Sequence, residues 1–207
     1  MSSTRERLIE TVCTLLEVQG YHATGLKQIL SESGAPKGSL YYHFPQGKEE
    51  LAEEAVMRSA GIVADRIRQV LARSEHVGLA VQGFVREIAE QIERSNFSSG
   101  GPLTTIALET VHSSQRLNSA CRNAYHLIQE AFAEKLAASG YPEAQTRQVA
   151  PFIVASIEGA ILLSRTNHSG DPLRQVADAL RLFFDRIPIP REPLREQTTH
   201  FQVQEDF

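Results

Sequence analysis

Hydrogen-bond donors are concentrated in one short stretch of the sequence. The stretch carries four donor side chains on what would be the exposed face of a helix: Lys37, Ser39, Tyr42 and His43. Leu40 and Phe44, four residues apart, form a narrow apolar seam through which that helix could dock on the helix that precedes it. A short helix held in this way offers its N-terminus and outer face to a partner, and the pattern predicts the major groove of DNA.

The residues of this stretch and its flanks divide into two expected roles. Small residues and a flexible cation allow close approach at a helix N-terminus, so base edges are the expected targets of Lys37, Gly38 and Ser39. Pro36 would offer its ring to a thymine methyl. The expected phosphate contacts are Tyr41, Tyr42, His43 and Lys48, with Lys27 and Thr24 completing the set. For the two tyrosines, packing within the module is the alternative.

Positioning these residues requires two short helices and a break. An apolar face predicts one helix from Leu26, residues 33–36 interrupt it, and a second helix follows over 37–44. This arrangement is a helix-turn-helix. A preceding helix is expected to begin at the capping box Ser3–Glu6, to end at Gly20 and to brace the other two.

The sequence GAPKGSLYYHF, followed by KEEL, resembles the TetR-type (TetR/AcrR) one-component repressors over roughly the first fifty residues. In finer detail, ATGLKQI and FPQGKEEL are similar to the branch named for lincomycin-resistance and flavonoid-responsive repressors. The resemblance implies a small-molecule cavity among C-terminal helices. Gly25 and Pro36 depart from the family pattern, which has threonine or serine at the first position and more often serine at the second. Thr24 is then expected to supply a helix cap or a phosphate hydroxyl.

Charge alone does not predict DNA binding. The 207 residues contain 21 basic and 25 acidic side chains, with five basic and four acidic in residues 1–48. A mildly acidic protein is not an indiscriminate nucleic-acid binder, so binding would depend on where the few cations lie. Cys13 and Cys121 are expected to be free thiols in a reducing cytoplasm. The longest apolar run, Phe152–Leu163, is shorter than the roughly twenty residues of a membrane span.

Helix follows helix in the remainder of the chain, without an alternating strand pattern, which predicts an all-α fold. The expected organisation is a three-helix DNA-binding domain over residues 1–48, a larger helical effector-binding and dimerisation domain over 49–187, and an extended or disordered tail over 188–207. The last two helices carry apolar residues on more than one face. One face would pack within the subunit and the other against a second copy, which predicts a homodimer with a four-helix interface.

An apolar, weakly aromatic cavity would suit a flat or lipophilic small molecule. The candidate effector-binding residues are Phe84, Ile88, Leu103, Ile106, Glu109, Tyr125, Phe152, Ser156 and Glu158; Leu108, Val111 and Ile153 are further candidates for the lining. Glu158 is the one carboxylate within the apolar run, and burying it without a partner is costly. Either it caps a dimer contact or it faces the cavity.

The competing class is an enzyme or a ligand carrier. Glu109 with His112 and His126 with Glu130 share helix faces and could ligate a metal, but two-residue pairs are weak signals. The sequence has neither a nucleophile elbow nor a phosphate-binding glycine loop. The preferred hypothesis is a cytoplasmic, homodimeric repressor that leaves a palindromic operator when an effector binds, with neither cofactor nor catalytic activity.

Overall fold

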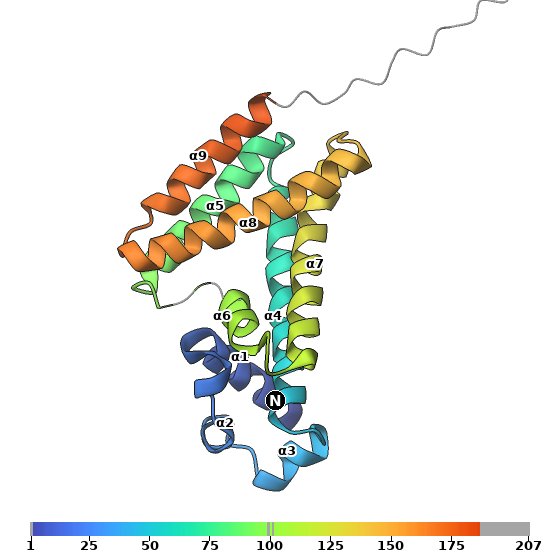
Figure 1. Ribbon diagram of the computed structural model, residues 1–207, viewed down its shortest axis with the longest axis vertical. Helices are drawn as coiled ribbons and strands as arrows, with labels where there is room; N and C mark the ends of the chain where they lie inside the picture. The colour runs from blue at the N-terminus through green and yellow to red at the C-terminus, as the bar shows by residue number, and fades with distance from the viewer. Residues whose placement is uncertain (1, 99, 101, 187–207) are drawn as a thin grey trace, which may run out of the picture.

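The computed structural model describes residues 2–98, 100 and 102–186, and this part of the chain contains helices joined by turns, without strands (Figure 1). Its nine helices are α1 (Thr4–Ala23), α2 (Leu26–Ser33), α3 (Lys37–His43), α4 (Lys48–Leu71), α5 (Val77–Arg94), α6 (Pro102–Thr110), α7 (Gln115–Ala138), α8 (Glu143–Asn167) and α9 (Asp171–Arg186). The predicted all-α fold is confirmed. The predicted tail over 188–207 lies outside the described residues.

The first three helices form one end of the molecule (Figure 1). The capping box at the start of α1 is confirmed: Ser3 Oγ accepts from the Glu6 amide, and the Glu6 carboxylate accepts from the Ser3 amide. The predicted end of this helix at Gly20 is a kink instead. Gly20 has φ +76°, and a last helical turn continues to Ala23.

Two long helices connect this end to the rest of the molecule. α4 and α7 lie side by side along the long axis (Figure 1). Both bury several alanines, including Ala55 and Ala60 on α4 and Ala124 on α7. At the far end the Arg68 guanidinium donates two hydrogen bonds to Glu134, of 2.7 and 2.8 Å.

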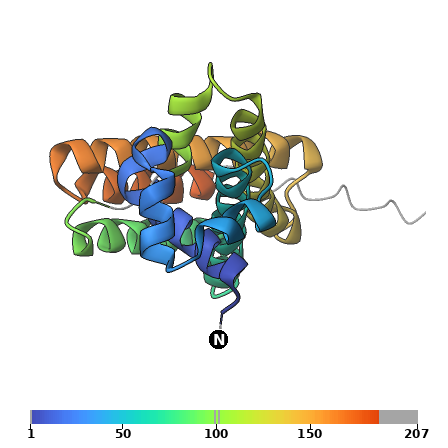
Figure 2. The ribbon, with the colours of Figure 1, turned by 90° about the horizontal axis from the view of Figure 1, so that it is seen from below.

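The opposite end is a wider layer of three helices. α5 and α9 pack along each other, and α8 crosses against both and against α7 (Figure 1). Seen from below, α1 to α3 lie in front of this layer (Figure 2). The fold therefore separates the helix-turn-helix from the surface formed by α8 and α9.

One helix of the described residues, α8, is long and apolar enough to cross a membrane by length and composition. An 18-residue window in it has a mean hydropathy of 1.4, and 44% of that window is buried within the protein. The run Phe152–Leu163 considered from the sequence understates this helix, which has 25 residues. Core helices of globular proteins pass the same test, and α8 packs on α5, α7 and α9.

The cysteines are both free thiols, Cys13 on α1 and Cys121 on α7. Burial raises the pKa of Cys13, and it raises that of Cys121 to about 11. Both thiols are therefore protonated and weakly nucleophilic at neutral pH.

Phe44 and Tyr42 allow the stability of the helix-turn-helix to be separated from its outer surface. Phe44 is fully buried, whereas Tyr42 is 81% exposed. We expect Phe44→Ala to lower the free energy of unfolding by about 3–5 kcal/mol and Tyr42→Ala to change it by less than about 0.5 kcal/mol. Urea denaturation of the two variants beside the wild type measures both. Equal losses would contradict the packing described here.

Candidate nucleic-acid interface and effector cavity

The helix-turn-helix is formed by α2 and α3 with a sharp turn at Gly34. Gly34 has φ +61°, and an added Cβ would meet no atom within 4 Å. Glycine is therefore favoured here by the backbone conformation and not by a lack of space. Leu40 and Phe44 are fully buried beneath α3, which packs on α1. The apolar seam predicted from the sequence is confirmed, but its main packing partner is α1 rather than the preceding helix α2. The seam turns the opposite side of α3 outward.

Most of the predicted DNA contacts lie on this outward side. Those that are exposed are Lys27, Pro36, Lys37, Gly38, Tyr41 and Tyr42. Tyr42 cannot be a packing residue at 81% exposure, whereas Tyr41 is half buried at 50%. The exposed surface of α2 and α3 therefore offers two cations, two phenols and a small residue, although their contacts with DNA remain a prediction.

Two further predicted contacts are partly buried on the same helix. The Ser39 hydroxyl donates to the Pro36 carbonyl over 2.6 Å, which leaves its oxygen able to accept. The His43 ring meets the Tyr42 ring edge to face, with centroids 5.0 Å apart. Ser39 and His43 are thus oriented by neighbours within the helix-turn-helix.

The structure corrects two of the predicted phosphate contacts. Thr24 is fully buried and its hydroxyl donates to the Gly20 carbonyl over 2.6 Å, so it neither caps α2 nor reaches a phosphate. The cap position of α2 is Gly25, which has no side-chain acceptor. Lys48 also points inward: its ammonium donates to the Tyr21 carbonyl over 2.6 Å and lies 4.0 Å from the Tyr21 ring centroid. Desolvation lowers the Lys48 pKa, with the Glu109 charge opposing the shift.

Free positive charge near α3 is limited. Arg5 pairs with Glu54, and Arg58 lies 3.3 Å from Glu10, so both are partly neutralised. Within the described part of the chain, Lys27 and Lys37 have no ion-pair partner. These two exposed ammonium groups are therefore available to pair with an anion such as a phosphate.

A cavity of about 400 Å³ lies between α1 and the helices α5 and α8 of the opposite layer. Its walls come from six helices, α1 and α4 to α8, and are mostly apolar. Four of the predicted effector-binding residues line it: Phe84, Ile88, Leu103 and Glu158. Glu158 therefore lies at this cavity, as one of its two expected roles requires.

The other predicted effector contacts lie elsewhere. Ile106 is a core residue that does not reach the cavity, and the Ser156 hydroxyl donates to the Phe152 carbonyl over 2.8 Å. Phe152 is 47% exposed on the outer face of α8 and tilts against the Phe183 ring. Glu109 binds the backbone of α1. Of the further candidates, Leu108 is exposed on α6, Val111 is exposed in the turn that follows α6, and Ile153 is a core residue outside the lining.

Part of the cavity wall could not be anticipated from local sequence pattern. α1 contributes Cys13, Thr14 and Glu17, and α4 contributes a strip that includes Ile62 and Arg66. Arg66 donates to Gln91 and lies 3.4 Å from Glu87, so its charge is already paired. A helix of the end that carries the helix-turn-helix thus borders the space in which a ligand would lie.

Glu158 is the end of a buried hydrogen-bonded chain. Thr104 Oγ1 donates to Glu158 Oε2 over 2.7 Å, and the Tyr125 hydroxyl lies 2.8 Å from the same Thr104 oxygen. Since the threonine proton is used toward Glu158, the tyrosine must donate to the threonine. Burial raises the pKa of Glu158, and burial together with the Glu158 charge raises that of Tyr125 to about 12. Tyr125 is thus a supporting residue behind the cavity wall.

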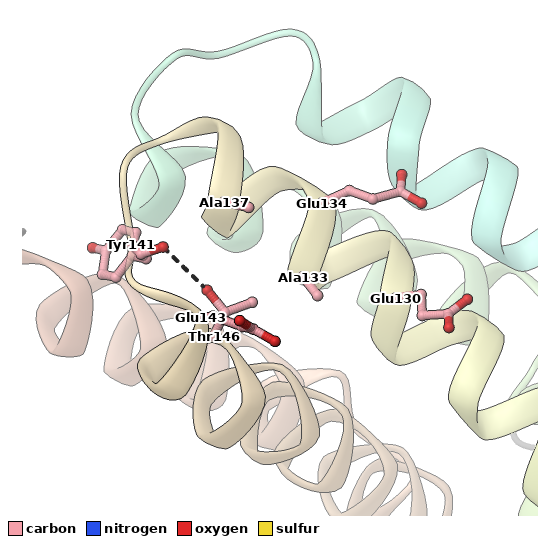
Figure 3. Close-up of a pocket in the computed structure, with 7 residues that line it drawn as sticks. All are labelled: Glu130, Ala133, Glu134, Ala137, Tyr141, Glu143 and Thr146. Carbon is pink, nitrogen blue, oxygen red and sulfur yellow. Dashed lines mark hydrogen bonds between the residues drawn. The ribbon is translucent and has the colours of Figure 1, made fainter.

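A second pocket, of about 410 Å³, lies at the corner between α7 and α8 (Figure 3). Three carboxylates surround a floor of small side chains, with Thr146 Oγ1 donating to the Tyr141 carbonyl over 3.5 Å. Its Glu134 is already bound by Arg68. Nothing in this corner indicates a ligand.

Metal binding is not supported by the arrangement of ligating side chains. In the range covered by the structure, no group of three or more His, Cys, Asp and Glu could hold an ion. Of the pair Glu109 and His112, which the sequence suggested as metal ligands, the Glu109 carboxylate already accepts hydrogen bonds from backbone amides of α1.

Comparison with known proteins identifies the family. Residues 8–55 match the model for bacterial regulatory proteins of the tetR family, and residues 78–179 match that for the C-terminal domain of LmrA/YxaF-like transcriptional regulators. The chain is 41% identical over 176 residues to the uncharacterized HTH-type transcriptional regulator YxaF of Bacillus subtilis, covering 85% of this chain and 92% of YxaF. The chain belongs to the TetR family. Regulators of this family bind DNA and typically act as dimers.

Further relatives agree with this assignment. The HTH-type transcriptional regulator LmrA of Bacillus subtilis is 37% identical over 176 residues, covering 85% of this chain and 94% of LmrA. The crystal structure of reduced E. coli NemR superposes with a TM-score of 0.74 at 20% identity, covering 86% of this chain and 95% of NemR, and shows the same fold. The matched families and relatives of this TetR-family chain are transcriptional regulators and not enzymes.

The raised pKa of Glu158 predicts how stability depends on pH. The folded state holds the Glu158 proton to a higher pH than the unfolded state does, so ionising this carboxyl destabilises the protein above its ordinary pKa of 4.5. We expect Glu158→Gln, which can still accept from Thr104, to raise the melting temperature at pH 7. This gain should shrink toward zero as the pH falls to 4.5. Melting curves across that range measure it, and a gain independent of pH would contradict the buried carboxyl.

Proposed function

We propose that this TetR-family chain is a cytoplasmic homodimeric repressor that binds a palindromic operator through α3 and leaves it when a small effector occupies the cavity. The observation that carries the proposal is the two-sided character of α3. Leu40 and Phe44 are fully buried on one side, while Lys37, Gly38 and Tyr42 are exposed on the other. A short helix anchored in this way can enter the major groove with its N-terminal residues at base edges.

Dimerisation is supported by an apolar surface on α8 and α9. Phe152, Leu162 and Leu163 of α8 are about half or more exposed, and Leu182 of α9 is 57% exposed. Exposed large apolar side chains grouped on one face indicate a protein interface. Gly159 lies among them with open space around it, so a partner helix could approach closely. We assign this surface to a second copy, giving two copies of α3 at a fixed spacing of about one or more turns of DNA.

The cavity supports a lipophilic or aromatic effector that carries a hydrogen-bond donor. Most of its wall is apolar, and one of its polar groups, Glu158, accepts one hydrogen bond from Thr104. A carboxyl group in such surroundings has further acceptor capacity for a hydroxyl or amine of the ligand. An anionic ligand is less suitable, because the one arginine of the wall is paired with Glu87.

The proposed response to the effector is a shift between two conformations. An effector that binds better to the conformation with the wrong spacing of the two α3 helices lowers operator affinity by that difference in binding energy. α1, α4 and α6 all border the cavity and also contact the helix-turn-helix or its supports. They are the elements through which occupancy would change the spacing.

DNA binding is tested with duplexes selected from a randomised pool by the wild-type protein. We expect Lys37→Ala to weaken binding to the selected duplex by about 1–3 kcal/mol, and Tyr42→Phe to weaken it by about 1 kcal/mol through loss of the hydroxyl. Fluorescence anisotropy at several salt concentrations measures both. Arg147→Ala is the matched control, because it removes a charge of the same sign from the distant α8. Equal affinities for Lys37→Ala and Arg147→Ala would refute the assignment of α3.

The dimer surface is tested by substituting Gly159 with arginine. An added side chain at Gly159 meets no atom within 4 Å in the single chain, so Gly159→Arg should leave the fold intact and break the dimer. Gly83→Arg on α5 is the matched control, because Gly83 is also an exposed helical glycine with open space around it. Sedimentation velocity should show monomers for the first variant and dimers for the second. Dimers for both would place the interface elsewhere.

A further inference from the structure

The kink in α1 leaves a short helical turn that needs a cap. Gly20 has φ +76° and ψ −176°, so the regular helix stops there and restarts as the turn Tyr21–Ala23. The first amides of any helical segment have no acceptor within the segment. This turn leads through Thr24 directly into α2, and its orientation therefore sets where the helix-turn-helix begins.

The cap comes from a distant part of the chain. Glu109, near the end of α6, places one carboxylate oxygen 2.7 Å from the Tyr21 amide and 3.1 Å from the His22 amide. In addition, the His22 ring nitrogen Nε2 lies 3.0 Å from the Glu109 carbonyl oxygen. A carbonyl only accepts, so Nε2 must carry the proton. Glu109 thus does for this turn what an acidic N-cap residue does for a helix.

The surroundings of this contact match the same role. An ideal Cβ on Gly20 would lie 2.5 Å from a Glu109 carboxylate oxygen. Glycine is therefore favoured at this position both by the close approach of Glu109 and by the positive φ. The carbonyl of the same first residue, Tyr21, accepts from the Lys48 ammonium. The turn is therefore held by α6 through its amides and by α4 through a carbonyl.

We propose that Glu109 is a positioning residue for DNA binding: it caps the Tyr21–Ala23 turn from α6 and thereby holds α2 and α3 in the orientation that fits DNA. This inference rests on the DNA-binding function proposed above. α6 also borders the cavity at its other end, where Leu103 forms part of the wall and Thr104 binds Glu158. The cap is consequently located on a helix that an effector would touch.

The test compares three variants of the full-length protein on the selected duplex. Glu109→Gln keeps an oxygen that can accept from both amides, Glu109→Asp keeps the charge but shortens the reach, and Glu109→Ala removes the cap. We expect Glu109→Ala and Glu109→Asp to weaken DNA binding about fivefold to tenfold, and Glu109→Gln to bind within about twofold of the wild type. Hydrogen exchange at Tyr21 and His22 should accelerate in Glu109→Ala and Glu109→Asp but not in Glu109→Gln.

Electrostatics alone predicts a different order. Removing an acidic group strengthens attraction to DNA, so both Glu109→Ala and Glu109→Gln would bind more tightly if charge were the only effect. Glu90→Ala on the exposed side of α5 measures that effect by itself. Circular dichroism and melting curves report whether each variant is folded. Should Glu109→Ala fail to fold, the relative DNA affinities of Glu109→Asp and Glu109→Gln still test the positioning role.

Two failures can be told apart. If the wild type selects no duplex, the DNA-binding proposal is wrong, whatever the exchange data show. If the wild type binds but Glu109→Asp binds equally well, the positioning role is wrong and DNA binding stands. Faster exchange at Tyr21 and His22 without weaker binding likewise overturns the positioning role, because the cap would then be only structural.

Discussion

The structure depends on the burial of Leu40 and Phe44 beneath α3. A helix of seven residues is not stable alone in water, so α3 exists as a helix because this apolar seam packs on α1 and its surroundings. The same burial makes the opposite side of α3 an exposed surface of donors. One face of α3 thus stabilises the fold and the other is available for recognition, and the position of α3 depends on α1.

α1 links the two ends of the molecule. Its start is fixed by a capping box, its middle forms part of the cavity wall through Cys13, Thr14 and Glu17, and its last turn is held by α4 and α6. The polar chain from Tyr125 through Thr104 to Glu158 places an oriented carboxyl group in the mostly apolar wall of the cavity. Because α1 and α6 both border this cavity and meet at Glu109, a ligand would act on the helix-turn-helix over a short path.

Features encoded by local pattern were predictable from the sequence, whereas those that depend on distant partners were not. The capping box, the turn at Gly34 and the seam of α3 follow from spacing within one helix or turn. Thr24 and Lys48 were assigned to phosphates because sequence does not reveal the carbonyls of the kinked α1 that they bind. Glu109 lies 88 residues from Tyr21, and nothing in the pattern of α6 indicates that contact. The cavity wall from α1 and α4 likewise depends on how helices pack.

Hydroxyl-radical footprinting on the duplex selected by the wild-type protein tests the central claim most directly. A homodimer that reads DNA with two copies of α3 predicts two protected half-sites related by a dyad, on one face of the duplex and about 10 base pairs or a multiple apart. A single protected site without dyad symmetry, or protection that does not depend on sequence, would contradict the account.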